Sequence, residues 1–216
     1  MDNLRLGKRL QAVVREVEGR RLADVGCDHG KVSVACLLAG KVERVIACDI
    51  SQKSLQKAVD LANKLQVKGI EFRAGDGLQV INDGEVNCVV IAGMGGNEIM
   101  SILSRIPQGV KRLVLSPHRN TVELRQFLSD KGIYIAKDYI VKDGSKFYDV
   151  IVAELDSDKD CALDRRQLLL GKNTHCEDFN EYMQYLRKKY DIIAIQNYNS
   201  EQAKLYREMF ELAELI

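Results

Sequence analysis

The sequence predicts an α/β domain built on a mostly parallel sheet, followed by a helical C-terminal region. From residue 21 to residue 132, short apolar runs alternate with segments whose apolar residues recur at helical spacing. Two β-rich runs then follow, and Asp143-Gly144 between them is a strong hairpin signal. Beyond residue 161 only helical periodicity remains.

Each element is expected from its local pattern. A first helix is predicted over 4–18, because Leu6, Leu10 and Val14 fall on one face at helical spacing. Ser51 can cap a later helix, since its hydroxyl can accept a hydrogen bond from a free backbone N–H. The expected strands are 21–25, 42–49, 70–73, 87–92, 112–116, 134–141 and 146–154, and the other expected helices lie near 31–39, after Ser51, at 97–103 and at 121–129.

The end of this sheet distinguishes two fold classes. Strands that alternate with helices form right-handed βαβ units and a parallel sheet. A dinucleotide-binding domain would end on another parallel strand, whereas here the sheet closes with an antiparallel hairpin over 134–154. This arrangement is that of the Rossmann-like methyltransferases. The prediction is therefore a mostly parallel seven-stranded sheet with a terminal antiparallel hairpin.

The C-terminal region is expected to form a second unit. Residues 156–161 are polar and are interpreted as a linker. Apolar residues at spacings of four and three then occur over 179–193 and 205–216, and Ser200 can cap the second run. We expect a coiled-coil helical hairpin. The predicted division is a methyltransferase domain that binds the methyl donor at 1–157 and a helical, coiled-coil domain at 158–216.

Composition restricts the expected localisation and the kinds of binding surface on the protein. The 216 residues carry a formal net charge of +1, so any nucleic-acid surface must be a local patch. No run of apolar residues is long enough to span a membrane, and the N-terminus does not resemble a secretory signal. The six cysteines form no CxxC pair, so we expect reduced thiols, no metal site and a cytoplasmic protein.

Two strand ends suggest a nucleoside-binding site. The run from Asp24 to Gly30 follows the first strand, and its glycines allow a ligand to approach the backbone closely. Alone, this run is equally consistent with a structural turn. Asp49 ends the next strand, and its carboxylate can accept both hydroxyls of a ribose. Asp28 would repel a pyrophosphate but tolerate a sulfonium, which favours S-adenosylmethionine over NAD.

Two further strand ends complete the predicted site. Asp76, in Gly75-Asp76-Gly77, is placed to reach an adenine amino group, although a solvated turn residue is the alternative. The glycines around Met94 leave room for a flat ligand, and Met94 either lines the pocket or packs in the core. The predicted cofactor-binding residues are Asp24, Gly26, Cys27, Asp49, Ile50, Asp76, Gly77, Ala92, Gly93 and Met94.

These motifs, in this order, resemble the bacterial tRNA (adenine-N1)-methyltransferases that modify adenine 22. The resemblance spans nearly the whole chain and is carried by residues 22–29, 75–78, 91–96 and 168–173. There are two departures. Lys31 stands where the family usually has an aromatic residue, and Ser116-Pro117-His118 replaces the family's Gln-Pro-Asn. Both lie near the expected position of the target base, so they bear on which nucleotide is methylated.

The resemblance implies methyl transfer from S-adenosylmethionine to N1 of an adenine in tRNA. Asp28 is the first candidate for a catalytic role and His29 the second, with a structural role at a helix start as the alternative for His29. The base must be unpaired or flipped out, because N1 lies on its pairing edge. Basic residues expected to contact RNA, rather than simply to be solvated, are Arg5, Lys8, Arg9, His118 and Arg119.

Other functions remain open at this stage. The enzyme could act on another RNA base or on a small molecule, or the chain could be a non-catalytic Rossmann domain that binds RNA or a protein partner. A nicotinamide-dependent dehydrogenase is a weaker alternative. Binding of the methyl donor would separate these classes. The sequence does not fix the oligomeric state, for which we expect a monomer.

Overall fold

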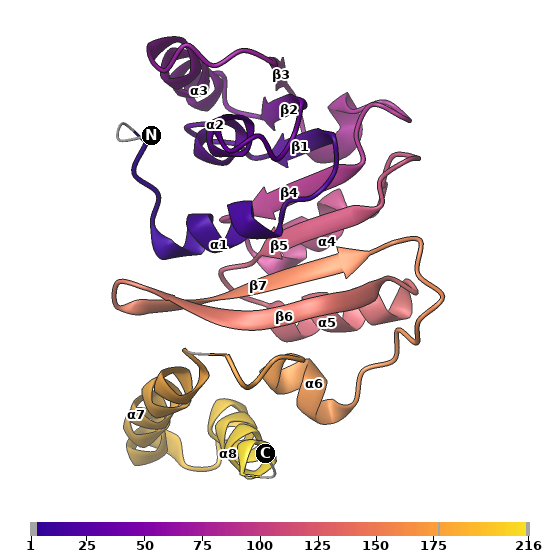
Figure 1. Ribbon diagram of the computed structural model, residues 1–216. Coiled ribbons are helices and arrows are strands. Elements are labelled where there is room, and N and C mark those ends of the chain that lie inside the picture. The colour runs from indigo at the N-terminus through magenta and orange to yellow at the C-terminus, as the bar shows by residue number, and fades with distance from the viewer. Residues whose placement is uncertain (1–3, 177, 215–216) are drawn as a thin grey trace.

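A computed structural model describes residues 4–176 and 178–214, and it is built around one seven-stranded sheet (Figure 1). The strand order is β3-β2-β1-β4-β5-β7-β6. The first five strands pair in parallel, and β7 runs antiparallel to both β5 and β6. This confirms the predicted Rossmann-like methyltransferase fold. The strands are β1 (Arg21–Val25), β2 (Arg44–Asp49), β3 (Ile70–Ala74), β4 (Cys88–Ala92), β5 (Arg112–Ser116), β6 (Tyr134–Asp143) and β7 (Lys146–Glu154).

Helices cover both faces of the sheet and bury two separate cores. Alternate residues of each strand point to opposite faces, so in β1 Leu22 packs into one core and Ala23 into the other. The first core lies under α1 (Lys8–Glu16), α2 (Lys31–Leu38) and α3 (Gln52–Lys64), and the second under the 3-10 helix η1 (Gly77–Val80), α4 (Gly96–Ile102) and α5 (Thr121–Asp130).

The start of α1 corrects one prediction. The helix begins at Lys8 rather than at residue 4, because Gly7 has an extended backbone and occupies the N-cap position. The backbone N–H of Arg9 donates to Asp143 Oδ2 at 3.3 Å, so a carboxylate from the distant hairpin satisfies part of the helix start. Arg5 therefore precedes the helix instead of projecting from it.

The C-terminal helices pack against the β6 edge of the sheet (Figure 1). They are α6 (Arg165–Leu170), α7 (Phe179–Asn197) and α8 (Glu201–Ala213). Side chains of α7 and α8 form a third core, which also contains Ile140 of β6 and Phe147 of β7. Ser200 Oγ accepts from the backbone N–H of Ala203, which confirms the predicted cap of α8.

A buried cluster, here called the Arg125 latch, joins these helices to the sheet. Arg125 of α5 donates to Asp138 Oδ2 of β6 at 2.7 Å and to Asp149 Oδ1 of β7 at 2.6 Å. Its Nη1 also donates to the carbonyl of Leu168 in α6 at 3.1 Å. Since Arg125 and Asp138 are almost fully buried, the latch fixes the hairpin and α6 in one arrangement.

Candidate active site

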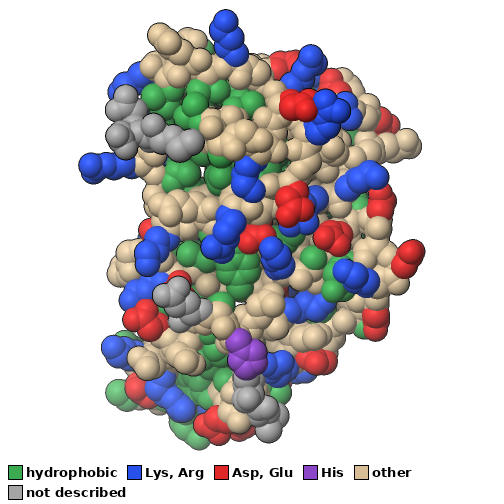
Figure 2. Space-filling model, in the orientation of Figure 1, with side chains coloured by type: hydrophobic (Ala, Val, Ile, Leu, Met, Phe, Trp, Pro, Cys, Tyr) green, Lys and Arg blue, Asp and Glu red, His purple; other side chains and the backbone are tan. Residues whose placement is uncertain are grey.

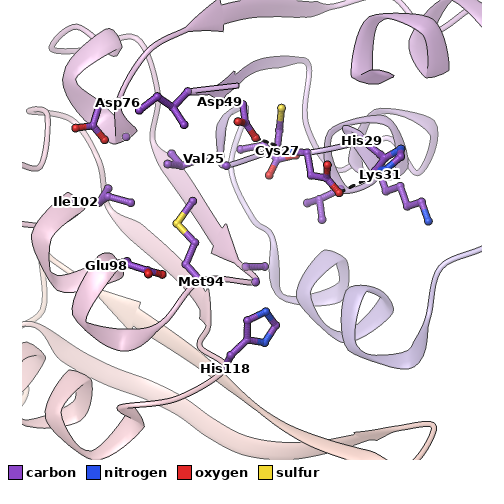
Figure 3. A pocket seen from close by; sticks show the side chains of 18 of the residues that line it. Val25, Cys27, His29, Lys31, Asp49, Asp76, Met94, Glu98, Ile102 and His118 are labelled. Carbon is purple, nitrogen blue, oxygen red and sulfur yellow. Dashed lines mark hydrogen bonds and ion pairs between the residues drawn. The ribbon is translucent and has the colours of Figure 1, made fainter. Parts of the chain in front are cut away.

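A cavity of about 780 Å³ opens at the carboxyl ends of the parallel strands (Figure 3). Loops after β1, β2, β3, β4 and β5 all contribute to its wall, together with the first turn of α1 and one face of α4. Every residue predicted to bind the cofactor lies on this wall: Asp24, Gly26, Cys27, Asp49, Ile50, Asp76, Gly77, Ala92, Gly93 and Met94. The structure thus brings four separate sequence motifs into one site.

The loop after β1 is held tightly against its neighbours. Gly26 has a φ of 66°, and a Cβ at this position would overlap the Cε of Met94. The backbone N–H groups of Gly26 and Cys27 both donate to the carbonyl of Cys48 on β2. Asp28 has a φ of 46°, which places a non-glycine residue in the left-handed region. Such a conformation persists only where the surroundings enforce it, and it occurs preferentially at functional sites.

Asp49 supports this loop through its side chain. Its Oδ2 accepts the backbone N–H of Asp28 at 3.1 Å, and its Oδ1 accepts that of Ser51 at 2.8 Å. These two bonds fix the orientation of a half-buried carboxylate that still lines the cavity. A carboxylate fixed in this way is suited to accept the two hydroxyls of a ribose.

Asp24 places a second carboxylate at the base of the cavity. It is 4% exposed, and its Oδ2 accepts both the hydroxyl of Ser33 at 2.6 Å and the backbone N–H of the same residue at 3.1 Å. Burial raises the pKa of Asp24 to about 6, although the two hydrogen bonds from Ser33 oppose this rise. Above this pH the base of the cavity carries a negative charge.

The residues predicted to be catalytic lie at the rim. The side chains of Asp28 and His29 are 64% and 48% exposed, and His29 Nε2 lies 3.6 Å from Asp28 Oδ2. Both line the cavity, as does Lys31, which follows them. Figure 3 shows His29 and Lys31 at this position. The rim therefore combines a carboxylate with an imidazole and an ammonium group that an incoming substrate can reach.

The residues predicted to contact RNA divide into two groups according to whether they line the cavity. Arg9 and His118 line the cavity, whereas Arg5, Lys8 and Arg119 do not. Arg119 instead forms an ion pair with Glu98 at 3.4 Å. The first turn of α1 lies against the hairpin and the ends of β4 and β5, so Arg9 points into the site rather than only to the surface.

His118 is placed beside positive charge at the mouth of the cavity. Its ring lies 5.9 Å from that of Tyr148 on β7, centroid to centroid. Burial and the neighbouring Arg9 guanidinium lower the pKa of His118, and Lys146 adds to this effect. The imidazole is therefore held in its neutral form near pH 7, in which it can accept a hydrogen bond.

Sequence reasoning missed the contribution of α4. Glu98, Ser101 and Ile102 all line the cavity from this helix. Glu98 Oε2 accepts the backbone N–H of Gly95 at 2.7 Å, which fixes the start of α4 beside the glycine loop. A glutamate three residues after Gly95 is a capping pattern and was the available signal.

The described part of the chain has neither a metal-binding cluster nor a disulfide near this cavity. Residues 4–176 and 178–214 contain no group of three His, Cys, Asp or Glu side chains that could hold a metal ion. All six cysteines are free, and four of them are buried. Burial raises the pKa of the Cys27 thiol well above its ordinary value, so this cavity residue is an unreactive thiol. No described helix has both the length and the apolar character needed to cross a bilayer.

The sheet topology and this site define a Rossmann-like methyltransferase. In agreement, residues 6–151 match the family model described as "Methyltransferase domain". The chain belongs more narrowly to the family of bacterial tRNA (adenine(22)-N1)-methyltransferases. The member from Bacillus subtilis is 35% identical over 176 residues, which cover 79% of this chain and 74% of the relative.

Solved structures agree over the whole chain. The B. subtilis m1A22 tRNA methyltransferase has a TM-score of 0.76 at 29% identity, and the match covers 99% of this chain and 97% of that one. A Streptococcus pneumoniae protein solved in complex with S-adenosyl-L-methionine has a TM-score of 0.82 at 26% identity. That match covers 98% of this chain and 99% of the other.

Proposed function

We propose that this protein transfers the methyl group of S-adenosylmethionine to N1 of adenine 22 in tRNA, in the cytoplasm. The observation that carries the proposal is the single cavity in which the predicted donor-binding loops meet beside the open Gly93 loop. Its volume of about 780 Å³ suits a nucleoside donor with a second base alongside it. Family membership supports the same activity.

The cavity wall fits the donor along its length. Asp49 would hold the ribose hydroxyls, and Asp76, in the loop after β3, would take the adenine amino group. Gly26, which also lines the cavity, would lie beside the methionine portion. The donor supplies an electrophilic methyl group on a cationic sulfonium, and the carboxylates of Asp24, Asp28 and Asp49 surround the space with compensating negative charge.

Methylation of adenine at N1 does not require a general base. N1 of neutral adenine already has a lone pair, so no base has to remove a proton before attack. The product carries a positive charge, so a carboxylate at the rim stabilises the developing charge. We assign this role to Asp28, whose carboxylate can also accept a hydrogen bond from the 6-amino group. His29, 3.6 Å away, would orient Asp28. Alignment of the flipped base supplies the rest of the rate enhancement.

Calorimetric titration with S-adenosylmethionine and with NADH tests the donor assignment. We expect binding of the first only, and we expect Asp49→Ala to weaken it strongly. Asp60→Ala is a matched control, because Asp60 is an exposed carboxylate that does not line the cavity. Binding of NADH without binding of the methyl donor would contradict the proposal.

Incubation with unmodified tRNA and labelled donor tests the acceptor assignment. Mass spectrometry of nuclease fragments should locate the label at N1 of adenine 22. Label at another base would assign the enzyme to a different RNA site, and label in a small molecule alone would remove tRNA as substrate. Donor binding without any transfer would favour a non-catalytic RNA-binding role.

A further inference from the structure

Arg9 of α1 carries a buried N–H group that has no role in the reaction as proposed above. Its Nη1 is buried and has no hydrogen-bond partner among the described residues. The guanidinium carbon lies 5.0 Å from the centroid of the Tyr148 ring, a cation–π contact. Such a contact does not replace a hydrogen bond from the N–H to an oxygen. An arginine cannot lose its proton in a protein. A buried N–H that carries charge and lacks a partner is costly, so a missing acceptor is indicated.

The geometry shows where this acceptor would lie. A Cβ on Gly93 would lie 3.6 Å from Arg9 Nη1 and 3.6 Å from His118 Nε2, so both nitrogens border the open side of this glycine. Arg9 and Gly93 both line the cavity. The free N–H is thus at the glycine loop beside which methyl transfer is proposed.

The charge at this end of the cavity is positive. Arg9 and Lys146 both lower the pKa of His118, while Glu98 opposes them only weakly and is itself paired with Arg119. An uncompensated guanidinium here would disfavour a reaction that creates a cation on adenine. An anion bound to Arg9 would remove that conflict and supply the missing acceptor.

We propose that Arg9 binds an oxyanion carried into the cavity by one of the two reactants. This inference rests on the proposed function, which brings two such groups: the carboxylate of the donor's methionine portion and the phosphates that flank the target nucleotide. Arg9 is a substrate-anchoring residue under either source. It is not part of a surface patch that attracts RNA over a distance.

The donor arm of the test compares S-adenosylmethionine with its decarboxylated form, which lacks only the carboxylate. If the carboxylate is the ligand, wild-type protein binds the complete donor about 10- to 100-fold more tightly, and Arg9→Met removes this preference. Arg9→Lys restores part of it. Arg44→Met is the matched control, since Arg44 is exposed and lies at the start of β2, away from the cavity.

The phosphate arm uses unmodified tRNA in which one phosphate next to adenine 22 is replaced by a neutral methylphosphonate. If a phosphate is the ligand, this change lowers the kcat/KM of the wild-type protein about 10- to 100-fold at saturating donor. In Arg9→Met, the methylphosphonate does not lower kcat/KM any further. The substitution is made on each side of the target in turn.

The inference is overturned if wild-type protein distinguishes neither the two donors nor the two kinds of tRNA. This comparison needs no variant, so a folding defect in Arg9→Met cannot hide the result. Methylation of unmodified tRNA by wild-type protein is measured in the same series. No methylation there counts against the proposed function, whereas normal methylation without either preference counts against the role of Arg9 alone.

Discussion

Asp28 combines backbone strain with a carboxylate at the rim. A non-glycine residue in the left-handed region costs roughly 1–3 kcal/mol, and here the bond from its N–H to Asp49 helps to maintain it. Asparagine tolerates this conformation and has nearly the same shape, so it tests the charge alone. The strain and the exposure of the side chain both favour a functional over a structural reason for aspartate here.

We expect Asp28→Asn to lower kcat by about 100-fold, because it removes a charge that stabilises the transition state. Donor affinity should stay within about threefold, since the loop backbone is preserved. Single-turnover kinetics and donor titration measure the two effects separately. Asp28→Gly is a useful companion, because it relieves the strain while removing the carboxylate. Near-normal turnover in both variants would exclude Asp28 from the mechanism.

Asp24 gives a prediction about stability and pH. Its folded pKa, about 6, lies above the ordinary value of 3.8, so folding favours the protonated form. The associated stability is present below about pH 4 and is lost as pH rises through 6. We expect Asp24→Asn to raise the free energy of unfolding at pH 7.5 by up to about 3 kcal/mol, and to weaken donor binding. Urea unfolding at pH 7.5 and at pH 4.5 should show a smaller difference at the lower pH.

The sequence predicted which strand-end loops line the cavity, but not which of the basic residues do so. Asp49 and Asp76 were predictable because strand ends in a parallel sheet meet at one edge. Arg9 was grouped with Arg5 and Lys8, because helical periodicity shows which residues share a face, but not which distant strand ends that face meets. The contact of Gly7 and Arg9 with Asp143 depends on the hairpin, more than 130 residues away.

The Arg125 latch is the junction between the sheet and the C-terminal helices. Two carboxylates share one guanidinium in a buried setting, where burial raises the pKa of Asp149 against the pull of Arg125. Gly171 is part of the same junction, because a Cβ there would come within 3.0 Å of both Arg125 and Asp138. Removal of the cation would leave two buried carboxylates facing each other.

We expect Arg125→Met to lower the free energy of unfolding by about 3–5 kcal/mol. Arg165→Met is the matched control, since Arg165 forms an exposed pair with Glu208 at 2.6 Å and should contribute less than about 1 kcal/mol. Urea unfolding followed by circular dichroism measures both. Equal losses in the two variants would show that the latch does not stabilise the junction.

Most elements were predictable, and the exceptions have physical causes. All seven strands were expected close to their observed bounds, because apolar runs between turns are a strong local signal. The short elements η1 and α6 were missed, since four and six residues show too little periodicity. The coiled-coil packing of α7 against α8 stays a prediction, although both helices occur where expected.

Charge is distributed unevenly over the whole molecule. Residues 1–21 hold six basic and three acidic side chains, whereas residues 158–216 hold nine basic and eleven acidic ones. Figure 2 shows basic side chains spread across one face with acidic ones between them, rather than in one continuous patch. Recognition of a folded RNA therefore has to combine a few phosphate contacts with shape.

We expect Arg5→Glu combined with Lys8→Glu to weaken tRNA binding and to leave donor binding intact. Both residues are exposed and lie outside the cavity. Each phosphate contact that is lost reduces the number of counterions released when tRNA binds. The salt dependence of binding should therefore also become less steep. Filter binding over a salt series measures this. An unchanged affinity and slope would exclude this N-terminal segment as an RNA contact.

The proposed division at residue 158 separates two units that are not expected to be independent of each other. The third core joins α7 and α8 to Ile140 and Phe147 of the hairpin, so the helices share buried surface with the sheet. We expect limited proteolysis to cut within 156–161, where most residues are exposed, and the two fragments to co-elute in gel filtration. Fragments that separate would show that the helical unit is held mainly by its covalent connection.

The position of α1 has a consequence for how the chain folds during its synthesis on the ribosome. The helix is among the first segments to emerge, yet Glu16 accepts hydrogen bonds from Lys137 and Tyr139, and Arg9 meets Asp143. These partners are translated more than 120 residues later. All residues of the cavity wall are translated by His118, before the hairpin exists. The nascent enzyme can therefore assemble its donor-binding loops early, while Arg9 reaches its final place only after translation of the hairpin is complete.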